Sequence, residues 1–172
     1  MSLAYFEYEL DLHCLYSSPE STDSEEELKS IQDAELDKKF WKALEDSDLS
    51  TIKDLVENHN YDITNKFNCA DTILDRIYTS SHCDNNIKFK ILKYALQTSK
   101  KQKEFEVDDL QYGLICMLEY APLESIKYLV EFKPEAFKNM QLYDHNLEDM
   151  IDNEQELQIR EYLVEKGLKL ES

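Results

Sequence analysis

One stretch of this chain, residues 49–57, returns 74 positions later as residues 123–131, and six of its nine positions are identical. The likeness extends backward, because Leu44 aligns with Leu118, and Phe40 four residues earlier falls opposite another leucine. Apolar residues in these segments recur at the three- and four-residue spacing of amphipathic helices. The sequence therefore predicts that a pair of helices is repeated, rather than a single helix.

Two further units complete the pattern. A spacing of 74 is about twice 37, and a middle unit is present, with apolar residues at 73–78 and again at 89–96. In the last unit, residues 162–165 (Tyr-Leu-Val-Glu) repeat residues 128–131 at a spacing of 34, after apolar residues within 147–151. A helical hairpin cannot bury both of its faces alone, so we expect four hairpins stacked in a row.

Three families of helical arrays have periods of this size: ankyrin, tetratricopeptide and HEAT-like repeats. Residues 40–59 resemble the ankyrin pattern of a short helix, a tight turn and a second helix rich in leucine and valine. Residues 162–170 resemble the ankyrin second helix and its stop, with Gly167 at the position where a left-handed backbone costs least. The resemblance covers residues 34–170 as about four divergent repeats. It implies a mainly all-α, ankyrin-like solenoid whose concave face binds another protein.

The sequence also departs from the ankyrin pattern. No unit has the threonine-proline-leucine-histidine start, and the turns between helices hold Ser47-Asp48 and Ala121-Pro122 instead of glycine. The sequence therefore favours simple loops in place of the β-hairpin fingers of typical ankyrin units. The alternative fold is an irregular stack of α-hairpins without β-fingers.

The chain is expected to have three parts. Within residues 1–16, apolar and polar side chains alternate from residue 5 onward, which predicts a short strand with one buried face. Residues 17–27 are serine-rich and acidic, with no large apolar side chain, and predict a linker in which Ser24 could cap the following helix. Residues 28–172 form the predicted helical repeat domain.

Composition narrows the possible functions. The only glycines among 172 residues are Gly113 and Gly167, far below the average of about 7%, which disfavours phosphate-binding loops and nucleophile elbows. The four cysteines are scattered without a CxxC pair, as expected for reduced thiols in the cytoplasm. No apolar run approaches the ~20 residues of a membrane span, and the sequence predicts no signal peptide. We therefore expect a cytoplasmic protein.

Residues capable of catalysis or metal binding are few. His13-Cys14 and His82-Cys83 are adjacent pairs, and adjacent residues of a strand point to opposite faces. His59 and His145 fall at unit ends, where polar turn residues are common. The expectation is a non-enzymatic protein with no catalytic residue, no cofactor and no metal.

The net charge of −18 comes from 37 acidic and 19 basic residues. Such a chain repels nucleic acids and anionic membranes, and attracts basic proteins. The leading hypothesis is a protein-binding module with a basic protein partner, such as an immunity or inhibitor protein that neutralises a cationic toxin, for example a nuclease. The alternatives are an ankyrin-type effector or viral host-interaction factor, and an acidic mimic of nucleic acid.

The candidate binding residues are acids near the ends of the predicted first helices, with one aromatic residue as an anchor. They are Glu45, Asp46, Asp48, Glu119, Asp152 and Glu154, with Tyr120 as the anchor. The segment 88–103 is instead rich in lysine. It contains six lysines, and no acidic residue occurs within residues 85–103. It either pairs with the acidic N-terminal segment or forms a second binding patch.

Overall fold

The computed structural model describes residues 24–66, 71–79, 84–143 and 153–171. The chain divides into two compact units, residues 1–34 and 35–172, and the following concerns the second unit. The strand predicted within residues 1–16 and the helix predicted at 147–151 lie outside the described residues. The first helix begins at Ser24, the residue predicted to cap it.

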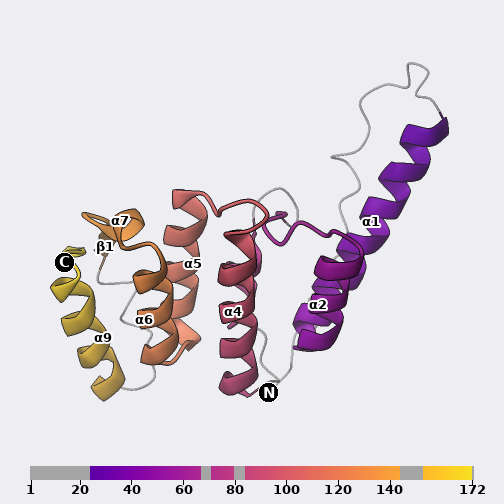
Figure 1. Ribbon diagram of the computed structural model, residues 1–172. Helices are drawn as coiled ribbons and strands as arrows, with labels where there is room; N and C mark the ends of the chain where they lie inside the picture. Colours follow the sequence, from indigo (N-terminus) through magenta and orange to yellow (C-terminus); the bar gives the residue numbers. More distant parts are fainter. Residues whose placement is uncertain (1–23, 67–70, 80–83, 144–152, 172) are drawn as a thin grey trace, which may run out of the picture. The chain divides into compact units, whose positions relative to one another are not determined.

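The described chain is mainly helical, as predicted (Figure 1). Most of the helices follow one another in pairs, and each pair of successive helices is called a hairpin: α1 (Ser24–Glu45) with α2 (Leu49–Asn58), α3 (Ile73–Arg76) with α4 (Asn85–Ser99), and α5 (Val107–Tyr120) with α6 (Leu123–Phe132). They are followed by α7 (Pro134–Phe137), β1 (Gln141–Tyr143), α9 (Asn153–Glu165) and β2 (Lys169–Glu171). The strands β1 and β2 pair in parallel, with Leu142 opposite Leu170. The sequence pattern did not predict this strand pair.

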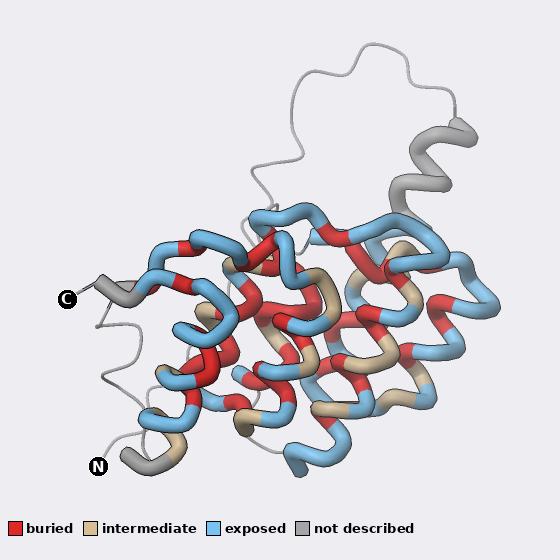
Figure 2. Tube along the Cα trace, turned by 60° about the vertical axis from the view of Figure 1, so that its left-hand side comes forward, coloured by how far each residue is buried: buried red, intermediate tan, exposed pale blue. Residues whose placement is uncertain are grey.

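The second helices α2, α4, α6 and α9 stand in a row in chain order, and each contacts the next (Figure 1). Behind this row, α3 packs against α5. Buried segments run along the sides where neighbouring helices meet (Figure 2). Residues 46–48, 84 and 121–122, at the turns within the hairpins, lie along one edge of the row, and residues 59–66 and 100–106, which leave α2 and α4, lie along the other (Figure 1).

A tyrosine fixes the register between neighbouring second helices. Tyr94, Tyr128 and Tyr162 stand 34 residues apart on α4, α6 and α9. The Tyr94 hydroxyl donates to Glu57 Oε1 of α2 at 3.1 Å, and Gln97 Nε2 of α4 donates to the Tyr128 hydroxyl at 3.3 Å. The same contact therefore recurs at successive junctions of the row.

The contacts made by the ring of each tyrosine also recur from junction to junction. Lys53 Nζ of α2 lies 5.4 Å from the centre of the Tyr94 ring, and Lys127 Nζ of α6 lies 5.3 Å from the Tyr162 ring. At the middle junction, the Phe89 ring of α4 meets the Tyr128 ring edge-on, with centroids 5.6 Å apart. We call the aligned positions that meet the next helix the seam positions. They are 49, 53, 56 and 57 in α2, 89, 93, 96 and 97 in α4, 123, 127, 130 and 131 in α6, and 157, 161, 164 and 165 in α9.

The turn between α1 and α2 and the turn between α5 and α6 differ in backbone geometry, although the helices around them repeat in sequence. Ser47, between α1 and α2, has a φ of 52°, in the left-handed region that favours glycine. Ala121, between α5 and α6, is extended, with φ −92° and ψ 141°. Gly167 has a φ of 89° after α9, which confirms the predicted left-handed helix stop.

Predicted apolar positions form the core. Leu55 and Val56 of α2 and Leu129 and Val130 of α6 are all buried, which confirms the burial predicted for these four residues. The residues linking α4 to α5, 100–106, contain no strand.

Gly113 allows α3 to approach α5 closely. A Cβ atom built at Gly113 would lie 2.8 Å from Leu74 Cβ of α3. Leu74 Cβ is fixed to the backbone, so a rotamer change cannot relieve this contact. The glycine is thus required by packing between the helices, since its own backbone is helical.

Replacing Leu129 with alanine should lower the free energy of unfolding by about 2–5 kcal/mol, because Leu129 is fully buried and the change leaves a cavity. Urea denaturation measures this. Leu157→Ala is the matched control, since Leu157 is 57% exposed on α9, and should change stability by less than about 0.5 kcal/mol. Equal effects of the two changes would show the register of the row to be wrong.

Gly113→Ala should destabilise the protein, although glycine to alanine inside a helix ordinarily stabilises it by about 1 kcal/mol. The added methyl group would overlap Leu74, and overpacking costs about 1–3 kcal/mol. Thermal denaturation followed by circular dichroism gives the sign. Glu119→Ala, at an exposed site on the same helix, is the control. A higher melting temperature for Gly113→Ala would contradict the close approach of α3 and α5.

Candidate protein-binding surface

The turn edge is the edge of the row that carries the turns within hairpins, here residues 42–50, 84–88 and 117–126. Several second helices begin there, and helix N-termini favour carboxylates because their free N–H groups and dipole are positive. Asp48 caps α2, and Asp84 caps α4 by accepting a hydrogen bond from Asn86 N. The acids of this edge are Glu45, Asp46, Asp48, Asp84, Glu119 and Glu124, and its bases are Lys42 and Lys88.

Glu45 and Asp46 lie at the end of α1 and are strongly exposed. Lys42 Nζ donates to Asp46 Oδ1 at 3.0 Å and lies 3.8 Å from Glu45 Oε2. One lysine thus faces two carboxylates, and exposed pairs of this kind contribute little to stability. The turn keeps a net negative charge available to a partner.

Asp48 has a structural role that the sequence analysis did not assign. Its carboxylate accepts hydrogen bonds from Thr51 N at 3.1 Å and from Thr51 Oγ1 at 2.6 Å. These bonds lower the pKa of the Asp48 carboxyl. The residue is exposed, so its charge adds to the turn edge while its oxygens hold the start of α2.

Glu119 and Tyr120 lie at the end of α5, on the same turn edge as Glu45 but separated from it by the second hairpin (Figure 1). Glu119 is exposed, and the Tyr120 side chain is 48% exposed. Gln155 Nε2 of α9 donates to Ala121 O at 3.0 Å, which ties the last helix to this turn. Asp152 lies outside the described residues, as does the side chain of Glu154.

Sequence reasoning missed Asp84 and Glu124, which belong to the same edge. Neither residue is among the binding residues predicted from the sequence. Their signal was positional, since both stand at the start of a second helix, as Asp48 does. Helix-start positions in all units, rather than first-helix ends alone, would have found them.

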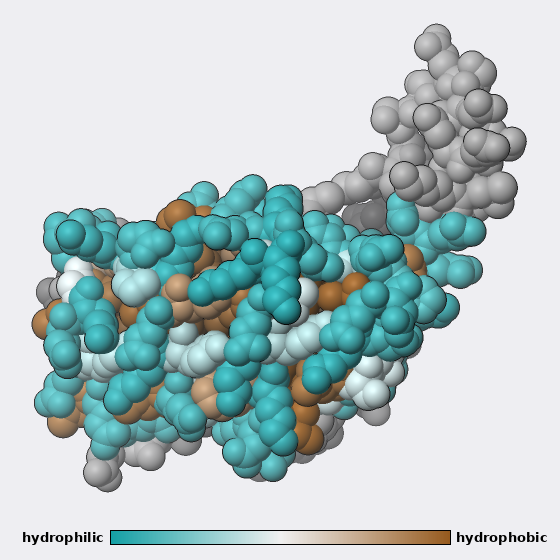
Figure 3. All heavy atoms as spheres, in the orientation of Figure 1, coloured by the Kyte–Doolittle hydropathy of each residue, from teal (hydrophilic) through white to brown (hydrophobic). Residues whose placement is uncertain are grey.

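The lysine-rich segment 88–103 is partly engaged within the row. Lys88 is buried, with Nζ 3.5 Å from Tyr78 O. Lys93 lies over the Phe89 ring at 4.1 Å, and Lys100 over the Phe132 ring at 4.5 Å. Hydrophilic side chains cover much of the face shown in Figure 3, with apolar ones visible between them. The segment is therefore not a uniform basic patch.

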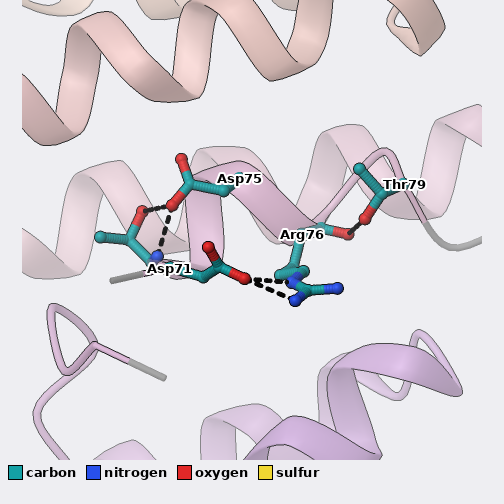
Figure 4. Close-up of polar contacts among 5 residues, drawn as sticks. Asp71, Asp75, Arg76 and Thr79 are labelled. Atoms are coloured by element: carbon teal, nitrogen blue, oxygen red, sulfur yellow. Dashed lines mark hydrogen bonds and ion pairs between the residues drawn. The ribbon is translucent and has the colours of Figure 1, made fainter. Parts of the chain in front are cut away.

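A second group of acids lies at α3, where Asp75 and the Asp71–Arg76 pair point to different sides of the helix (Figure 4). Arg76 Nε donates to Asp71 Oδ2 at 2.8 Å. Asp75 is 3% exposed, and its Oδ2 accepts hydrogen bonds from Thr72 N and Thr72 Oγ1. Asp75 Oδ1 is buried without a hydrogen-bond partner, which is costly for an ionised carboxylate.

The environment of Asp75 changes its acidity and that of its neighbour. Burial, with a contribution from Asp71 and Asp109, raises the pKa of the Asp75 carboxyl to about 6. Burial and the nearby Asp75 raise the pKa of the Cys116 thiol to about 11. A thiol of that acidity stays protonated at neutral pH, so Cys116 is a poor nucleophile.

A concave feature of the described residues is a shallow hollow of about 470 Å³ beside α5, bordered by Asp108, Tyr112 and Ile115 on one side and Lys138–Gln141 on the other. It contains no pairing of a nucleophile with a base. Among the described residues, no group of three or more histidine, cysteine, aspartate or glutamate side chains is arranged to hold a metal ion. Of the candidate features, the turn edge combines charge and exposure most clearly.

The fold and this surface define a mainly helical protein of stacked hairpins with an acidic edge. No protein-family model, curated protein or solved structure matches the chain. Within the described residues, no helix has both the length and the apolar character needed to span a bilayer.

Asp75→Asn should flatten the pH dependence of stability. The folded pKa of about 6 lies above the ordinary value of 3.8, so protonated Asp75 favours folding, and that stability is lost as the pH rises from about 4 to about 6. In urea denaturation, the free energy of unfolding of the variant minus that of the parent should grow by about 1 kcal/mol between pH 5 and 7. Asp108→Asn, at an exposed site on α5, is the control. A constant difference across this range would mean that Asp75 is solvated.

Proposed function

We propose that this chain is a non-enzymatic protein-binding module with an ankyrin-like stack of four divergent hairpins over residues 34–170. The recurrence of Tyr94, Tyr128 and Tyr162 at a spacing of 34, each contacting the helix before it, supports this proposal. In the proposed stack, simple loops such as residues 100–106 take the place of β-fingers. We place its action in the cytoplasm, where the free Cys116 thiol would stay reduced.

The proposed partner is a basic protein, and the observation that carries this is the charge of the turn edge. Six carboxylates stand there against two lysines, and one of those lysines, Lys88, is buried. A cationic toxin such as a nuclease is the concrete form of the partner, because the groove that binds nucleic acid phosphates is itself positive. The chain would then be an immunity or inhibitor protein.

The division of roles within the edge follows from exposure. Glu45, Asp46 and Glu119 would act at a distance, raising the rate at which a cationic partner arrives, and salt would screen this over about 8 Å at physiological ionic strength. Tyr120 would contribute contact energy on docking, because binding energy concentrates in aromatic and arginine side chains. Asp48 would contribute charge while capping α2.

The combined change Glu45→Lys, Asp46→Lys and Glu119→Lys should slow association with the partner at least about tenfold at low salt, because it inverts the field of the edge. Asp48 is left intact, since losing its cap would destabilise α2 by about 1 kcal/mol. The partner is recovered by pull-down from the source organism, and surface plasmon resonance at low and high salt measures the rates.

The matched control reverses three exposed acids away from the turn edge, Glu35, Asp108 and Glu135, and so changes the net charge equally. Its association rate should fall much less. If both triple variants slowed association equally, the net charge rather than the turn edge would drive binding. Unchanged rates in both, without salt dependence in the parent, would leave the acidity a role in solubility alone.

A further inference from the structure

The inner helices α2, α4 and α6 contact the next helix of the row through their seam positions. The outer face of α9, on the side away from α6, carries the same positions. At a spacing of 34 from α6, Leu157 aligns with Leu123 and Val164 with Val130. Glu165 likewise aligns with Glu131. In α2 and α4 the position of Glu165 is held by Glu57 and Gln97, the side chains that bond the next tyrosine. The last helix therefore keeps the residue types that join a further helix to the row.

Of these positions, that of Val164 is buried and that of Leu157 half-buried in the inner helices, whereas both are open in α9. Val56, Leu96 and Val130 are at most 3% exposed, whereas Val164 is 56% exposed. Leu157 is 57% exposed, and its spacing of seven from Val164 places both on one side of the helix. The opposite side carries the fully buried Ile159 and Leu163, and α9 contacts α6. This side of the helix thus carries two apolar side chains that no described element covers, beside Arg160, whose charge is paired with Glu156.

The two ends of the row differ. In α2, Asp54 stands at the position of the seam tyrosines, and its Oδ1 accepts a hydrogen bond from Asn58 Nδ2 at 2.7 Å. Arrays of helical repeats normally end in polar faces of this kind. Head-to-tail association of two chains would place Asp54 where the tyrosines meet the preceding helix, opposite Glu161 and Glu165, and would bring like charges together. The chemistry of the two ends therefore disfavours a linear chain of copies.

Charge decides what kind of helix fits the open face. The inner helices place a lysine at one seam position, as with Lys53 and Lys127 over the next tyrosine ring. At the same position α9 has Glu161, and Glu165 follows one turn later, both exposed. Two α9 helices face to face would oppose these carboxylates, which costs energy. A helix carrying lysines or arginines beside its apolar strip would pair with them.

We propose that the outer face of α9 is a docking surface for an amphipathic, cationic helix of a partner protein. Apolar side chains of that helix would cover Leu157 and Val164, and its basic side chains would meet Glu161 and Glu165. The inference does not depend on the turn edge, because it rests on the burial and alignment of α9 alone.

The chain itself contains a helix of the required kind. α4 (residues 85–99) carries lysines and no acid, has Tyr94, and packs on the seam positions of α2. A synthetic peptide with this sequence is therefore a suitable probe of the equivalent positions on α9.

The experiment measures the fluorescence anisotropy of the labelled peptide as the full chain is added. Saturable binding is expected, and Leu157→Gln with Val164→Gln should weaken it at least about tenfold. Glu161→Lys with Glu165→Lys should weaken it as well, by removing charge attraction. These residues are exposed, so the variants should keep the parent's circular dichroism spectrum. Tyr112→Gln, at an exposed site on α5, and the triple variant of the turn edge should leave the affinity unchanged.

Other results would overturn the proposal. A scrambled peptide of the same composition that bound equally well would show nonspecific charge attraction. Absence of binding, or binding insensitive to Leu157→Gln and Val164→Gln, would show that the α9 face does not accept such a helix. Sedimentation of the unliganded chain as a dimer that these two substitutions dissociate would make a second copy the occupant, in place of a cationic helix.

Discussion

The contact between neighbouring second helices supports the rest of the structure, since a hairpin alone leaves one apolar face in water. Burial of Val56, Leu96 and Val130 supplies most of its free energy, because apolar area removed from water is the largest favourable contribution to folding. The tyrosine on each incoming helix adds direction. Its hydroxyl and ring meet polar and cationic partners at fixed positions, and such bonds add about 1 kcal/mol each. Burial therefore holds the row together, and the tyrosines set its register.

This arrangement explains why acids collect at one edge. The second helices in the row start at the same side, so their positive N-terminal ends lie along one line (Figure 1). Carboxylates such as Asp48 and Asp84 satisfy the free N–H groups there. The local stability of each helix and the negative field of the whole edge thus have a common cause. A partner attracted by that field would meet side chains that folding had already placed.

The contact of α3 with α5 shows the cost of close packing. Because α3 has only four residues, it can bury its apolar side chains only by approaching α5 closely, and Gly113 leaves the room to do so. The same approach takes Asp75 out of water with one oxygen unpaired. A shifted pKa need not mark an active site, and here the Asp75 carboxyl with its pKa of about 6 stands beside an unreactive thiol.

The sequence by itself determined the helices and the repeat, because helical periodicity and a returning pattern are local properties of the chain. It placed Leu129 in the core and Gly167 at a left-handed stop, and both predictions are confirmed. It also placed Glu45, Asp46 and Glu119 on helix ends that share one edge, but it missed the capping bonds of Asp48 and the burial of Asp75. Only the tertiary structure decided those points, and it alone distinguishes Val130 from Val164. The two valines have the same sequence context, and what separates them is whether another of the described helices lies beside them.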